Sequence, residues 1–250
     1  MQSNGYFPLP FYEFFYELDG KILWHVDNEK DLGICTNQKL SWTLHCEMAI
    51  NKAVKQFNML RRTCYFIYDI RQRKALYVSL VRSLFEHCCQ IWAPQNVTTS
   101  VMFEKLQKSA VKWILNEQEK SYCEVVFLQK QRELDILPMK QKFLFSDLLL
   151  FYKIVNKQVE IKLPDYVTRI EPHDIIYSTK STKSISDGKD NLKYRSSIIP
   201  KVKSFQDGYF FRTLNRWNEI PLEIRSSKNF DKFSVLLREH MWLILGLKPD

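Results

Sequence analysis

Apolar residues in the middle of the chain recur at the spacing of helices that bury one face. From Cys46 to Cys64 the apolar positions are separated alternately by four and three residues, which places them on one side of a helix. Ser41 precedes this run and has the side chain of a good N-cap, so we expect it to cap this helix. The buried stripe is predicted to consist of Cys46, Ile50, Ala53, Phe57, Leu60 and Cys64.

A second and a third helix follow in the same pattern. The second is predicted over Arg71–Trp92 and ends before Ala93, because Pro94 pushes the residue before it out of helical geometry. Its buried face is predicted to carry Leu76, Leu80, Leu84, Cys88 and Ile91. The third helix begins near residues 98–100, and its apolar positions are Phe103, Leu106, Ala110, Trp113 and Ile114.

Three more helices complete the predicted helical part. A short helix around Cys123–Arg132 leads to another that starts at Pro138, where a missing N–H costs nothing. That helix presents Phe143, Leu144, Leu148, Phe151, Ile154 and Val155. An ordered stretch over Tyr209–Trp217 precedes the last helix, Asn229–Leu245, which turns Phe230, Phe233, Leu236, Leu237 and Met241 inward. Short connections between the elements of the first 160 residues favour an antiparallel helical bundle.

The first forty residues have the pattern of strands. Phe11–Leu18 is rich in aromatic residues, Asp19-Gly20 is a strong two-residue turn, and Lys21–Val26 returns as the second strand of a β-hairpin. Asp31–Cys35 is expected to add a third short strand, in which Gly33 allows a bulge or a close approach.

These patterns predict a mainly α protein with a small β part (α+β). The expected regions are a β-hairpin region over 1–40, a helical bundle over 41–160, a basic and partly mobile linker over 161–209, and a C-terminal segment over 210–250 that packs on the bundle. Residues 178–191 contain one apolar residue, Ile185, and are expected to form a mobile loop.

Charge and cysteine content indicate a basic intracellular protein. The 37 basic and 28 acidic residues give a net charge of +9, which fits contact with a polyanion. Nine Lys or Arg and three Asp lie between Ile176 and Arg216, so 9 − 3 = +6 of this charge is concentrated there. We expect no membrane span and no signal peptide. Six cysteines without a secretory signal indicate reduced thiols in the nucleus or the cytoplasm.

No motif in the chain predicts catalysis, a metal or a cofactor. His87, Cys88 and Cys89 are consecutive, and neighbours on a helix point about 100° apart, so they do not converge on one ion. The six glycines are scattered, and no two aspartates are adjacent, although two-metal phosphoryl transfer requires clustered carboxylates. We therefore expect no catalytic residue, no metal site and no enzyme activity of this chain alone.

Basic residues lie at helical spacings that could contact backbone phosphates. For each helical stripe the alternative is an ordinary solvated helix face. In the linker, Tyr177 and Tyr194 alternate with basic residues and could stack on unpaired bases. The candidate nucleic-acid-binding residues are Lys52, Lys55 and Arg62 on the first helix, Arg71, Arg73 and Lys74 on the second, Lys105, Lys108 and Lys112 on the third, and Lys193, Arg195, Lys201 and Lys203 in the linker.

Four segments of the chain resemble, in order and spacing, one region of a known family. They are DLGICTNQKLSW (31–42), ALYVSLVRSLFEHCCQIWAP (75–94), FEKLQKSAVKWIL (103–115) and FFRTLNRWNEIP (210–221). They are similar to the region behind the polymerase palm of jockey-like non-LTR retrotransposon reverse transcriptases. The matching positions look structural: Asp31, Leu32, Gly33, Leu40, Trp42, Leu76, Trp92, Pro94, Trp217, Asn218 and Pro221. His87 departs from the tyrosine that is common in the family.

The resemblance implies thumb-like helices that help to grip template RNA and the RNA–DNA hybrid. In the family a palm and fingers polypeptide precedes this region and holds the catalytic Asp-Asp pair. The chain is then a truncated transposable-element product that binds nucleic acid but does not polymerise. The alternative is a helical protein-interaction module, or a non-functional fragment, without a nucleic-acid role.

Overall fold

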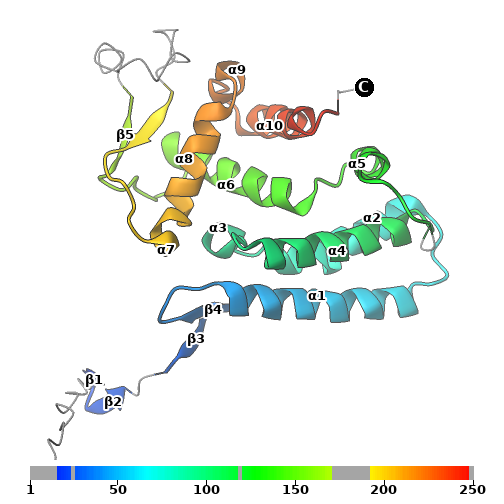
Figure 1. Ribbon diagram of the computed structural model, residues 1–250, viewed down its shortest axis with the longest axis horizontal. Helices are drawn as coiled ribbons and strands as arrows, with labels where there is room; N and C mark the ends of the chain where they lie inside the picture. Colours follow the sequence, from blue (N-terminus) through cyan, green and yellow to red (C-terminus); the bar gives the residue numbers. More distant parts are fainter. Residues whose placement is uncertain (1–15, 24–25, 118–119, 171–191, 248–250) are drawn as a thin grey trace, which may run out of the picture.

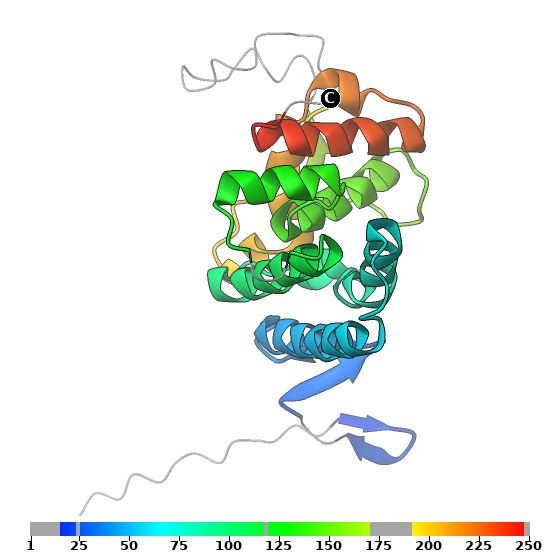
Figure 2. The same cartoon turned by 90° about the vertical axis from the view of Figure 1, so that its right-hand side faces the viewer.

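The computed structural model describes residues 16–23, 26–117, 120–170 and 192–247. Within these residues the protein is mainly α, with three short antiparallel strand pairs, which confirms the predicted fold class. The long helices stack in layers (Figure 1, Figure 2). Helix α1 (Thr43–Thr63) packs on α4 (Val97–Ile114), α4 packs on α6 (Met139–Val155), and α6 packs on α10 (Phe230–Ile244). No described helix is long and apolar enough to cross a membrane.

Helix α1 buries the stripe that its spacing predicts. All members from Cys46 to Leu60 are buried, and Cys64 is half-buried at the C-cap. The predicted N-cap is wrong, because the helix begins at Thr43 and its N-cap residue is Trp42. The Ser41 hydroxyl donates instead to the Thr43 hydroxyl at 3.3 Å, so it does not cap a helical N–H.

The second predicted helix is wrong in two respects. It is divided into α2 (Ile70–Leu80), a 3₁₀ turn η1 (Arg82–Phe85) and α3 (Cys89–Trp92), with Cys88 in a left-handed conformation at φ 48°. Its buried face also lies one residue further along the chain than predicted. The buried apolar residues are Tyr77, Val81, Phe85, Cys89 and Trp92.

Two adjacent apolar stripes explain this error. Each predicted position is followed by another apolar residue, so both stripes have the same spacing and the pattern cannot choose between them. In the fold the bulkier aromatic residues of the second stripe are buried, because they remove more apolar surface from water. Leu80 and Ile91 of the first stripe are exposed at 42% and 50%.

The helices that follow agree with their predicted positions. All five predicted apolar residues of α4 are buried, and α5 (Glu124–Glu133) lies where a short linking helix was expected. Helix α6 begins after Pro138, which has no capping side chain. Glu104 of α4 supplies the cap in its place, since its carboxylate accepts from the backbone N–H of Lys140 at 3.1 Å.

The C-terminal part packs around the opposite side of α6. Its elements are β5 (Val167–Arg169), β6 (Tyr194–Ser196), α7 (Lys203–Gln206), α8 (Tyr209–Glu219), α9 (Leu222–Arg225) and α10. One hydrophobic cluster lies between α1 and α6, and a second joins α6 to α8 and α10. Helix α6 belongs to both, because Phe143 enters the first cluster while Leu148 and Phe151 enter the second.

Two hairpins precede α1. Strands β1 (Tyr16–Leu18) and β2 (Lys21–Leu23) pair across Asp19-Gly20, as predicted; the expected strand residues before Tyr16 lie outside the described residues. The expected single strand over 31–35 is wrong. A second hairpin, β3 (Asn28–Asp31) and β4 (Ile34–Asn37), turns at Leu32-Gly33, where both residues have positive φ. Gly33 is therefore a turn residue, as in the type I′ turns of hairpins.

Candidate nucleic-acid interface

An open groove of about 770 Å³ lies where the C-terminal ends of α1 and α4 meet the start of α2. Helices α1 and α4 both end at this extremity of the molecule, beside the α1–α2 turn (Figure 1). We call this feature the α1–α2–α4 groove. Its lining residues are Lys55, Asn58, Arg61, Arg62, Tyr65, Tyr68, Arg73, Trp113 and Asn116. Of these described lining residues, four are basic and none is acidic.

Arg73 is a buried cation in the wall of this groove. The residue is 2% exposed, and its Nε donates to the carbonyl of Ile67 at 2.5 Å. Its Nη1 donates to the Trp113 carbonyl at 2.5 Å and to Asn116 Oδ1 at 3.2 Å. These bonds tie α2 to the end of α4. Within the described residues Nη2 has no hydrogen-bond partner and no carboxylate pairs with the guanidinium.

The nearest carboxylates along the chain are engaged elsewhere. Asp69 is the N-cap of α2, and its carboxylate accepts from the backbone N–H of Gln72 at 2.8 Å. Glu117, which follows α4, pairs with Lys120 at 2.8 Å and with Lys130 at 3.1 Å. These interactions hold the pKa of the Glu117 carboxyl at about 2, with the Lys120 hydrogen bond as the largest cause. Among the described residues, neither carboxylate forms an ion pair with Lys55, Arg62 or Arg73.

The two helix C-termini account for part of the basic character here. Cations near a helix C-terminus are stabilised by its partial negative charge, which amounts to roughly −0.5 for each helix. Arg61 and Arg62 lie in the last turn of α1 and gain from this effect. Two helix ends supply only about one unit of negative charge, against Lys55, Arg62 and Arg73 alone. Among the described residues the groove therefore has a positive excess that a bound anion would balance.

The remaining predicted residues of α1 and α2 lie outside the groove. Lys52 and Arg71 are exposed and Lys74 is half-buried, but none of the three lines it. The groove therefore unites Lys55, Arg62 and Arg73 from the predicted set.

The predicted stripe on α4 faces another helix. Lys108 pairs with Glu124 of α5 at 2.7 Å, and its ammonium lies 5.4 Å from the centroid of the Phe127 ring. Lys112 lies over Tyr122 at 6.0 Å. Lys105 is exposed. These contacts connect α4 to the segment that contains α5, so two of the three lysines have a partner inside the protein.

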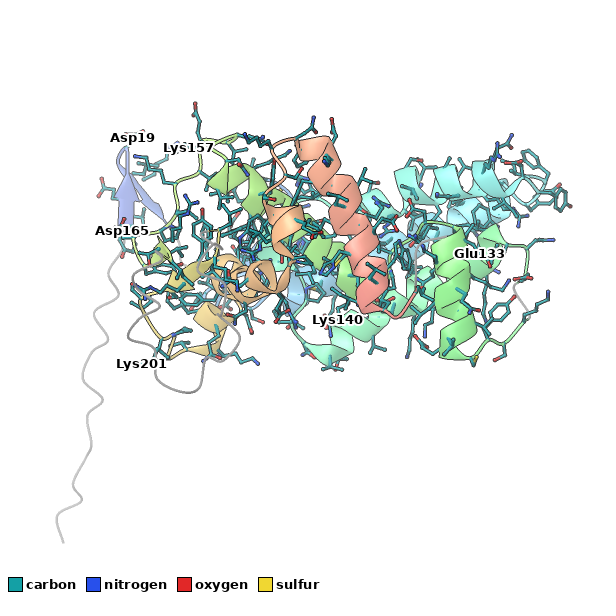
Figure 3. The ribbon with its side chains drawn as sticks, turned by 90° about the horizontal axis from the view of Figure 1, so that it is seen from above. Asp19, Glu133, Lys140, Lys157, Asp165 and Lys201 are labelled. Atoms are coloured by element: carbon teal, nitrogen blue, oxygen red, sulfur yellow. The ribbon has the colours of Figure 1, made fainter. Side chains whose placement is uncertain are left out.

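The basic residues of the linker lie at the other end of the molecule. Figure 3 shows Lys201 at the end opposite α2. Arg195 is exposed on β6, Lys193 is half-buried beside it, and Lys203 begins α7. The structure therefore does not bring this set and the groove residues together. Tyr177 and the predicted loop 178–191 lie outside the described residues.

Tyr194 cannot serve as a stacking platform, which corrects its predicted role. It is 8% exposed and its ring meets Phe151 edge-on at 5.5 Å. Trp217 and Asn218 hold β6 in place: the indole N–H donates to the Leu192 carbonyl at 2.9 Å, and the Asn218 side chain bonds both the N–H and the C=O of Tyr194. Asn218 itself lies within α8.

Sequence reasoning missed the aromatic part of the groove. Tyr65 and Tyr68 lie in the α1–α2 turn and are 69% and 70% exposed. Arg61 was also missed, although it adjoins Arg62. The available signal was the alternation of basic and aromatic residues over 61–74, where RRTCYFIYDIRQRK joins two predicted helices.

Two of the described cysteine thiols are buried in the first hydrophobic cluster. Burial raises the pKa of the Cys46 thiol to about 12 and that of Cys89 to about 11, so both are protonated at neutral pH. Among the described residues, no group of three or more His, Cys, Asp or Glu side chains is placed to hold a metal ion.

Comparison with protein-family models, with curated proteins and with solved structures found no match to this chain. The resemblance to reverse transcriptases therefore stays a prediction from the sequence, and the geometry of the groove is the basis for the function proposed below.

Proposed function

We propose that this chain binds RNA or an RNA–DNA hybrid through the α1–α2–α4 groove and has no polymerase activity of its own. The supporting observation is the gathering of Lys55, Arg61, Arg62 and Arg73 around one open groove, whose described lining residues include no carboxylate. A polyanion gains affinity by releasing counterions to such a surface. The proposal agrees with the sequence resemblance, in which this region of a reverse transcriptase grips nucleic acid and the preceding palm carries the catalytic aspartates.

Lys55 and Arg62 provide the sharpest test of the proposal. Both are exposed and neither forms an ion pair among the described residues, so their charges are available to phosphate. We expect the double variant K55Q/R62Q to bind a fluorescent RNA–DNA hybrid about tenfold or more weakly in an anisotropy titration. The slope of log affinity against log salt should fall by about 2, one for each lost phosphate contact.

The matched control is K162Q/K232Q, which removes the same charge from two exposed lysines outside the groove. It should bind nearly as tightly as the unchanged protein. Equal losses in the two double variants would mean that net charge and not the groove determines binding. If the unchanged protein binds neither single-stranded RNA nor the hybrid at low salt, the proposed function is incorrect.

A second candidate function is protein interaction through the β1–β2 hairpin. This hairpin projects from the helical body (Figure 1), and Tyr16 and Leu18 are 75% and 63% exposed on one of its strands. Exposed apolar side chains that are adjacent to one another mark interaction surfaces. The double variant Y16K/L18K should then reduce binding of a hydrophobic dye and any self-association seen by sedimentation. An unchanged protein that is a monomer and binds no dye would exclude this candidate.

A further inference from the structure

We propose that the α1–α2–α4 groove accepts an unpaired nucleotide of a single strand, whose base stacks on the rings of Tyr65 and Tyr68. This inference rests on the proposed function and names the form of nucleic acid that the groove selects. Its basis is the combination of exposed aromatic rings with a buried arginine that has no ionic partner among the described residues, in one open groove.

The aromatic rings of the α1–α2 turn are not part of either hydrophobic cluster. Tyr65, Phe66 and Tyr68 are 69%, 62% and 70% exposed, and none belongs to the packed residues of the clusters. Exposed aromatic rings beside cations are the parts from which single-strand binding sites are built, because every base has a flat face that can stack. Tyr65 is braced by Phe66, whose ring meets it edge-on at 5.7 Å.

Arg73 gives Tyr68 a fixed support. Its guanidinium carbon lies 5.6 Å from the centroid of the Tyr68 ring and 5.1 Å from that of Trp113, which is buried. The guanidinium is itself held by carbonyls of the α1–α2 turn and of α4. Tyr68 is therefore anchored through Arg73 to a core tryptophan while most of its surface stays open to solvent. A platform that is ordered before binding loses less entropy when a base stacks on it.

The size and charge of the groove fit one nucleotide with its phosphate. A volume of about 770 Å³ falls in the range of roughly 300–1,000 Å³ that is typical of small-ligand sites. Lys55 and Arg62 lie along the same wall and can neutralise the backbone on either side of the stacked base. Arg73 adds a donor, Nη2, that has no partner among the described residues. A base inside a duplex has both faces covered by its neighbours, so only an unpaired base can use the tyrosines.

The test compares single-stranded RNA with a blunt RNA–DNA hybrid of equal length, each measured by fluorescence anisotropy over a salt series. In the double variant Y65L/Y68L, leucine keeps apolar bulk but removes the ring face. We expect the affinity for single-stranded RNA to fall by about tenfold or more. Affinity for the hybrid should be unchanged. The salt dependence of binding should also be unchanged for both nucleic acids, because no charge is removed. Y65F/Y68F should restore single-strand binding, since phenylalanine retains the ring.

A matched control and the possible outcomes separate this inference from the proposed function. Y16L changes a tyrosine that is 75% exposed on β1 and should leave both affinities unaltered. An equal loss for RNA and hybrid in Y65L/Y68L, or no loss for either, would overturn the stacking inference while phosphate binding stands. Absence of binding to both probes by the unchanged protein would overturn the two proposals together. Circular dichroism of each variant establishes that the helices are retained.

Discussion

Leu32 adopts a backbone conformation that is costly for leucine. It is the first residue of the β3–β4 turn, with φ 46°, and Gly33 follows at φ 88°. A left-handed conformation costs an ordinary residue about 1–2 kcal/mol, whereas asparagine tolerates it well and is preferred in type I′ turns. The Leu32 side chain is 85% exposed, so its removal sacrifices little packing. The turn therefore retains strain that one substitution can relieve.

We expect Leu32→Asn to raise the free energy of unfolding by about 1 kcal/mol, measured by urea denaturation. The backbone carbonyl of residue 32, which lies 3.3 Å from His87 Nε2, is retained in the variant. Leu32→Ala is the control, because alanine removes the same exposed side chain but keeps the left-handed penalty. A similar gain from alanine would show that the exposed leucine, and not the backbone conformation, limits stability.

At the scale of elements, the β3–β4 hairpin is attached to the helical body through a neutral histidine. His45 is 8% exposed, and its Nδ1 accepts from the backbone N–H of Cys35 at 3.2 Å. The ring also meets Trp92 edge-on at 4.8 Å. Burial, and then the nearby His87 and Lys30, lower the pKa of His45 below its usual 6.5. Protonation would remove the acceptor and place a charge against the core.

The lowered pKa of His45 predicts a loss of stability in mild acid. A depressed folded-state pKa contributes stability that is present above about pH 6.5. That stability is lost as pH falls toward the lower folded-state value, by at most about 1.4 kcal/mol per pH unit for one proton. His45→Asn supplies an acceptor near the position of Nδ1 but does not titrate. The pH range from about 7.5 to about 5.5 brackets the ordinary histidine pKa of about 6.5. Over this range we expect the unfolding free energy of the unchanged protein to fall more than that of the variant.

His240 titrates in the same direction, because burial lowers its pKa as well. It is present in both proteins, so its contribution cancels when the two pH profiles are subtracted. Parallel profiles would contradict the role given to His45. A direct readout is hydrogen exchange at the Cys35 amide. Its protection factor, which corrects for the slower intrinsic exchange in acid, should fall at the acidic pH only in the unchanged protein.

The elements that sequence reasoning predicted well are those with a single apolar face. Most positions next to the α1 stripe are polar, so its register was unambiguous. From Leu76 to Trp92 two apolar stripes adjoin, and only the packing against α1 and α4 decides that Tyr77, Phe85 and Trp92 are buried. The left-handed break at Cys88 gave no signal, since cysteine does not favour that conformation.

The groove, too, could be predicted only in part, because tertiary packing brings its residues together. Lys55, Arg62 and Arg73 were identified separately as members of three-residue groups on two helices. Their convergence depends on the tertiary contact between α1, α2 and α4, which local spacing does not encode. Trp113 was correctly predicted as buried. Its second role, as the support for Arg73, appears only when the end of α4 is placed against α2.

At the scale of the whole molecule, Arg212 connects the two hydrophobic clusters. It comes from α8 and binds Asp147 of α6 through two nitrogens, at 2.8 and 3.1 Å. It also donates to the Gln90 carbonyl of α3 at 2.5 Å, and both charged side chains are largely buried. Burial raises the pKa of Asp147, and the Arg212 hydrogen bond opposes that shift. Without Arg212 a buried carboxylate would have no ionic partner at this position.

Arg212→Met should therefore lower the unfolding free energy by about 3–5 kcal/mol, as for a buried pair that loses one member. Arg216→Met is the matched control on the same helix: Arg216 is exposed and pairs with exposed Glu219, so we expect a change of at most about 1 kcal/mol. The Arg212→Met loss should shrink in acid, where Asp147 becomes protonated and no longer needs a cation.

Because α6 belongs to both clusters, fluorescence and far-UV circular dichroism should report one coincident transition in each protein. Two separate transitions in the unchanged protein would show that the clusters unfold independently, and equal losses in the two variants would show that Arg212 does not connect them.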